Sequence, residues 1–104
     1  GMTMQEFLDA LTAMRARGYQ PYLVAEAYGQ TIRLKSPAGA EHCPITAVYE
    51  CSTGQTCPPA AVYSTLERLG LDPDDAYTIV TAADGQTDEP ILYHQLLAAL
   101  ALLD

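Results

Sequence analysis

Glycine and proline divide this chain of 104 residues into short segments, and this spacing limits the possible fold more than any other sequence feature. Glycine ends helices and opens turns, while proline cannot continue a helix or a central strand. Short elements with short connections form a compact cluster around one shared core. Because 49% of the residues are hydrophobic, we expect residues 1–104 to form a single globular domain. We expect Gly1 to be a remnant preceding a natural start at Met2.

The first predicted element is a helix from Met4 to Arg17. Thr3 is a suitable N-cap, and Glu6 three positions later completes a capping box. Gly18 supplies the left-handed residue that ends the helix. Apolar residues recur at helical spacing and form one stripe: Met4, Phe7, Leu8, Leu11 and Met14.

A β-hairpin is predicted next, with strands at residues 21–28 and 31–36 and a turn at Gly29-Gln30. The second strand alternates, because Ile32 and Leu34 fall on one face and the residues beside them are basic. The first run contains alanines, so a short helix over residues 21–28 stays an open alternative.

After a loop at residues 36–40, the sequence predicts helices to its end, at residues 44–52, 59–69, 73–84 and 89–103. Asp72 is placed to cap the third of these helices, with Pro73 at its first position. The predicted fold is therefore α+β and mostly helical: an N-terminal helix, a β-hairpin, then a cluster of four short helices. The predicted core contains Phe7, Leu11, Ile32, Leu34, Ile45, Val48, Val62, Leu66, Leu69, Ile79, Val80, Leu92, Leu96 and Leu100.

The last predicted helix is apolar almost all round, which is typical of a helix at the centre of a fold or in an oligomer contact. A lone hairpin also leaves strand edges that another chain can pair with. These two features predict a homo-oligomer. The seven tyrosines either lie half-buried at the border of the core or form a contact surface for a partner, and both interpretations stay open.

Thirteen acidic and five basic residues give a net charge of −8, which disfavours nucleic acid and anionic membranes as partners. Residues 59–69 and 73–84 have helix-turn-helix proportions, but the second of these helices is acidic and carries no base. The apolar run Ile91 to Leu103 is too short to cross a bilayer. We interpret the acidic second half mainly as a solvated face, although a binding surface remains an alternative.

Three cysteines, Cys43, Cys51 and Cys57, are an odd number and do not form a disulfide framework. The first residues are acidic and do not form a targeting leader, so we expect a cytoplasmic location with three free thiols. Cys51 and Cys57 flank a short turn and form the only pair we expect to be able to oxidise.

His42-Cys43-Pro44 is the only local arrangement with chemical character, because a thiol at a helix N-terminus is favoured as the thiolate. A thiol-dependent enzyme would use Cys43, with His42 or His94 as the base. The simpler interpretation is that Cys43 is a small, partly buried residue. We therefore assign no catalytic residue and keep these three as candidates.

No metal site and no cofactor site are predicted. The spacing of Cys43, Cys51 and Cys57 contains no paired zinc-ligand motif, and the common nucleotide-binding motifs are absent from the sequence. The sequence therefore predicts a small cytosolic interaction or regulatory protein that is not an enzyme and whose protein partner is unknown. The alternative is the thiol-dependent enzyme using Cys43.

Overall fold

The computed structural model describes residues 1–27, 29–55, 62–86 and 90–103. Helix α1 (Met4–Met14) begins with the predicted capping box: the Thr3 hydroxyl accepts from the Glu6 amide, and the Glu6 carboxylate accepts from the Thr3 amide. The last turn of the predicted helix, Arg15–Arg17, is the 3₁₀ helix η1, and it ends at Gly18 with φ of 89°. Local capping therefore fixes both ends of this element as predicted.

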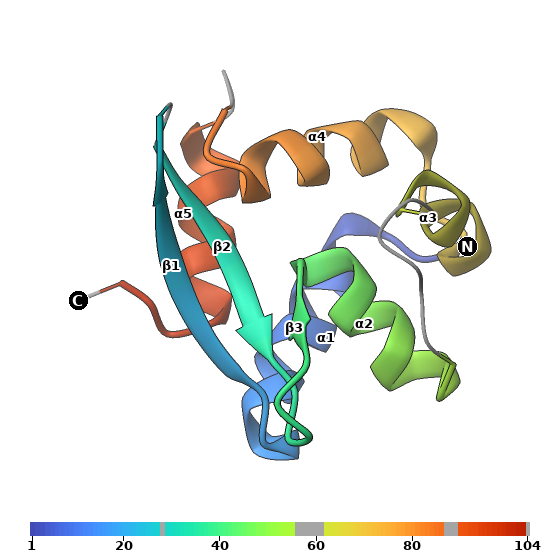
Figure 1. Ribbon diagram of the computed structural model, residues 1–104. Helices are drawn as coiled ribbons and strands as arrows, with labels where there is room; N and C mark the ends of the chain where they lie inside the picture. The colour runs from blue at the N-terminus through green and yellow to red at the C-terminus, as the bar shows by residue number, and fades with distance from the viewer. Residues whose placement is uncertain (28, 56–61, 87–89, 104) are drawn as a thin grey trace.

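Within the described residues, the strands form one three-stranded antiparallel sheet in the order β1-β2-β3. Strand β1 (Gln20–Glu26) pairs with β2 (Gly29–Lys35), which in turn pairs with β3 (Glu41–His42). Residues 20–26 are thus a strand and not a helix. Ile32 and Leu34 are both fully buried, as the alternation predicted. Figure 1 shows β1 as the outermost strand, on the left of the molecule.

Two predictions about this region are wrong. Gly29 and Gln30 do not form the turn, because Gly29 pairs with Glu26 and begins β2. The chain is also not helical throughout after residue 40, because β3 pairs Leu34 with His42 and Lys35 with Glu41. Two residues are too few to show a strand alternation, and it is the tight turn at residues 36–40 that brings them beside β2.

Four helices follow the sheet: α2 (Pro44–Thr53), α3 (Val62–Leu69), α4 (Pro73–Ala83) and α5 (Pro90–Ala99). The predicted beginnings at residues 59 and 89 lie outside the described residues. Helix α5 is shorter than predicted, since Ala101 adopts a left-handed conformation with φ of 54°. The Leu102 amide bonds back to the Leu97 carbonyl, which closes the helix before Leu103.

The core lies between the inner face of the hairpin and the helices. Figure 1 shows the helices behind the hairpin and to its right. Helix α5 runs alongside the hairpin. At one end the Tyr93 hydroxyl donates to the Gln30 carbonyl (3.0 Å), and at the other end Leu100 lines a pocket with Pro21. Leu69 and Val80 are partly buried, and Val62 and Leu66 lie outside the described side chains. The other ten predicted core residues are buried: Phe7, Leu11, Ile32, Leu34, Ile45, Val48, Ile79, Leu92, Leu96 and Leu100.

The first prediction concerns the cap of α4. The Asp72 carboxylate accepts hydrogen bonds from the Asp74 amide (2.9 Å) and the Asp75 amide (3.4 Å). Asp72→Ala removes the carboxylate oxygen that accepts both hydrogen bonds and should lower the free energy of unfolding by about 1 kcal/mol. Asp72→Asn retains a capping side chain and should lose only a fraction of this. Urea unfolding followed by circular dichroism measures both variants, and equal midpoints for the alanine variant and the parent would contradict the assignment.

Candidate functional site

The predicted His42-Cys43 pair belongs to a polar cluster at the start of α2, formed by Tyr19, His42, Cys43, Thr46 and Glu50 (the histidine cluster). Strand β3 places His42 opposite Leu34, and its side chain is only 12% exposed. The imidazole Nε2 lies 3.4 Å from the Glu50 carboxylate, and Nδ1 lies 3.5 Å from the Thr46 hydroxyl. The contact between Nε2 and Glu50 is a close approach of the ring to the carboxylate and not a hydrogen bond. Nε2 is buried and makes no hydrogen bond among the described residues.

Cys43 is the N-cap residue of α2, but its side chain does not cap the helix. Its sulfur lies 3.4 Å from the Thr46 hydroxyl, which also lies near His42 and donates to the Cys43 carbonyl. Thr46 therefore occupies the position between the thiol and the imidazole, and the described residues contain no hydrogen bond from Cys43 to a histidine. Because a nucleophilic thiol needs a base within hydrogen-bond reach, this geometry does not favour the enzyme alternative, which stays a prediction.

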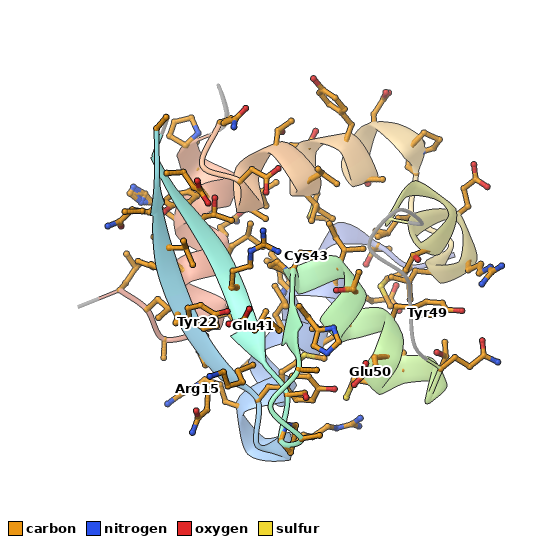
Figure 2. The ribbon with its side chains drawn as sticks, in the orientation of Figure 1. Arg15, Tyr22, Glu41, Cys43, Tyr49 and Glu50 are labelled. Atoms are coloured by element: carbon orange, nitrogen blue, oxygen red, sulfur yellow. The ribbon has the colours of Figure 1, made fainter. Side chains whose placement is uncertain are left out.

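Glu50 joins three segments of the chain. One carboxylate oxygen accepts a hydrogen bond from the Tyr19 hydroxyl (3.1 Å), and the other faces His42. Figure 2 shows Cys43 at the start of α2 and Glu50 further along the same helix. Burial raises the pKa of Tyr19 to about 12, and the hydrogen bond from its hydroxyl to Glu50 acts in the same direction. The cluster thus fixes the beginning of β1 and the short strand β3 against α2.

This environment predicts a loss of stability at high pH. An unfolded tyrosine ionises near pH 10, whereas folded Tyr19 keeps its proton to about pH 12. Between these values the unfolded state binds fewer protons, so the free energy of unfolding should fall as the pH rises. Tyr19→Phe should remove this contribution to the decrease in the free energy of unfolding. Tyr77→Phe changes an exposed site and should keep the decrease. Urea unfolding at pH 9 to 12 tests this, and identical slopes in both variants would contradict it.

Arg17 and Cys51 form a contact that the sequence did not predict. The guanidinium donates to the Cys51 sulfur (2.7 Å) and to the Cys51 carbonyl (3.3 Å), beside a small cavity of about 170 Å³. No spacing rule links residues this far apart, so the contact had no sequence signal. Cys43 and Cys51 are free thiols, and Cys57, the predicted oxidation partner, lies outside the described residues.

His94 lies on the exposed side of α5 and contacts the Tyr93 ring edge to face. It does not join the histidine cluster. With Ile91, Gln95 and Ala98 it forms an exposed stripe along α5, beside a shallow groove of about 540 Å³ that Leu103 also lines. Ile91 is 75% exposed and Leu103 is 47% exposed. The face of α5 turned away from the core is therefore only partly apolar, whereas the sequence predicted a helix that is apolar almost all round.

In the part of the chain that the structure describes, no three His, Cys, Asp or Glu side chains are grouped so that they could hold a metal ion. In the same part, no helix has both the length and the apolar character needed to cross a membrane.

The outer edge of β1 presents backbone groups with no hydrogen-bond partner among the described residues. Pro21 has no amide hydrogen, so its nitrogen must face away from β2 in this continuous ladder. Residues two apart in a strand face the same way, and therefore the amides and carbonyls of Leu23 and Ala25 also face outwards. This edge, from Pro21 to Ala25, is called the open edge below.

Charged groups lie at the two ends of the open edge. At its beginning, Tyr22 lines a pocket of about 250 Å³ with Gln20, Pro21, Lys35 and Glu41. Figure 2 shows Tyr22 and Glu41 close together, and burial, followed by the hydrogen bond to Glu41, raises the pKa of Tyr22. At the other end lie Glu26 and Asp84. Burial raises the pKa of Asp84, Glu26 adds to this shift, and Arg33 opposes it.

No family model, no curated protein and no solved structure matches this chain.

Proposed function

We propose that the protein is a small cytosolic interaction module without catalysis, and that it binds a partner through the open edge of β1. The observation that carries this proposal is the row of outward-facing backbone groups at Leu23 and Ala25. Unpaired amides and carbonyls on a strand edge are satisfied by a second extended segment, which adds a strand to the sheet. The partner therefore supplies an extended segment.

The open edge lacks most of the devices that prevent strand addition. Proteins protect sheet edges with charged side chains, prolines, bulges or very short strands. Strand β1 has seven residues in an unbroken register with β2, and Pro21 to Ala25 carry no charge. Pro21 blocks one position at the beginning of the strand and leaves Leu23 and Ala25 available. The pocket beside Tyr22 adds a place for one side chain of the bound segment.

Selection of peptides from a phage-displayed library of random nonapeptides, panned on the full-length protein, tests this proposal. Binding of the selected peptides should be lost on Ala25→Pro, because proline removes an outward-facing amide without affecting the bonds to β2. The matched control is Ala98→Glu, which places a charge on the exposed stripe of α5. Peptides that lose binding to Ala98→Glu but still bind Ala25→Pro would overturn the proposal, and so would a selection that enriches no peptide.

A further inference from the structure

We infer that the segment that pairs with the open edge is β1 of a second copy of this chain, antiparallel about a two-fold axis at Val24. This inference rests on the proposed function and names its partner. The two sheets then join into one continuous sheet, with the two β1 strands at its centre.

The position of Pro21 selects this register. A two-fold axis at Val24 places Leu23 of one copy opposite Ala25 of the other. Their outward-facing amides and carbonyls then form reciprocal hydrogen bonds on both sides of the axis. An axis at Leu23 would instead place Pro21 opposite Ala25, where the missing amide hydrogen leaves one carbonyl unpaired in each half. The register at Val24 thus uses all the available donors at the centre of the edge.

The side chains along β1 are complementary in the same register. Val24 meets Val24 of the second copy at the centre, and partly buried Leu23 is covered by Ala25 of the second copy. Glu26 of the second copy lies beside Tyr22. Tyr22 pairs with Arg33 within its own sheet, and it shares its pocket with Lys35. The Glu26 carboxylate therefore approaches two bases, Arg33 and Lys35, and one acid, Glu41. The two-fold axis repeats this arrangement at the other end.

Charge also determines the direction of the two strands. At the Gln20 end of β1 there are two bases and one acid: Arg15 lines a pocket with Gln20 and Pro21, and Lys35 on β2 lies beside Glu41. At the other end there are two acids and one base, because Glu26 and Arg33 both lie near Asp84. An antiparallel pair brings the basic end of each copy to the acidic end of the other, whereas a parallel pair would place like charges side by side.

Sedimentation equilibrium of the reduced protein from low to high micromolar concentration tests the inference. The mass should rise from 11.2 kDa towards twice that value. Ala25→Pro and Glu26→Lys should keep the mass at the monomer value. The matched controls Ala98→Glu and Glu67→Lys, both at exposed helical positions, should dimerise like the parent. A monomer mass for the parent at every concentration would overturn the second copy as partner, and the peptide selection would still decide the proposed function.

Cross-linking tests the register. Val24→Cys should form a disulfide between copies on mild oxidation, because the two α-carbons meet at the axis. Ala25→Cys, which faces Leu23 of the second copy, should cross-link far less, and both variants share the same native cysteines. Equal or stronger cross-linking of Ala25→Cys would overturn the axis at Val24.

Discussion

Replacing Phe7 by alanine should lower the free energy of unfolding by about 3–5 kcal/mol. Phe7 is the only phenylalanine of the chain and is completely buried in the core, on the face of α1 that packs against the other elements. Its loss removes apolar contact and leaves a cavity that the surrounding helices fill only in part. Because a domain of this size is stable by only about 5–15 kcal/mol, this single change removes a large part of the total.

Chemical unfolding followed by circular dichroism measures this loss. Ile91→Ala is the matched control, because Ile91 is 75% exposed and its truncation should change stability by less than about 0.5 kcal/mol. Phe7→Leu keeps most of the side-chain volume and gives a smaller loss if the alanine variant does not fold. Similar losses for Phe7→Ala and Ile91→Ala would contradict the placement of the core.

Gly85→Ala should be the second most damaging change, with an expected loss of about 2–4 kcal/mol. Gly85 follows α4 with φ of 70°, and an added β-carbon would lie 2.8 Å from the Gln30 carbonyl oxygen in β2. The substitution therefore combines backbone strain with a backbone overlap that requires α4 and the hairpin to move apart.

Gly54→Ala separates these two causes. Gly54 has nearly the same φ, 72°, and no atom within 4 Å of an added β-carbon, so its alanine variant carries the strain alone. We expect a loss of about 1–2 kcal/mol at Gly54. Thermal and urea unfolding of both variants measure the difference, and equal losses would show that Gly85 does not pack against β2.

Local signals in the sequence were sufficient for much of this fold. The capping box at Thr3 and Glu6 and the N-cap at Asp72 act over three or four residues, so both were visible in the sequence and both are present in the structure. Strand β3 had no such signal, because two residues show no periodicity and its pairing depends on β2. The early end of α5 at Ala99 was also missed, since alanine rarely adopts the left-handed conformation found at Ala101.

The candidate site was predictable only in its adjacent parts. His42 and Cys43 stood out because they are neighbours at a helix start. Tyr19 and Glu50 come to the same cluster from distant parts of the chain, and no sequence pattern indicates that meeting. The hairpin predicted strand edges, but only the pairing of β2 with β3 shows that β1 is an outer strand.

Residue-resolved hydrogen exchange of the β1 amides tests the open edge most directly. In dilute, monomeric protein, the Leu23 and Ala25 amides should exchange almost as fast as in an unstructured peptide, while the Tyr22 and Val24 amides, bonded to β2, should be protected. Raising the concentration into the dimer range should protect Leu23 and Ala25 as well. Strong protection of Leu23 and Ala25 in the dilute monomer would show that the edge is already covered, and would contradict its role as the binding surface.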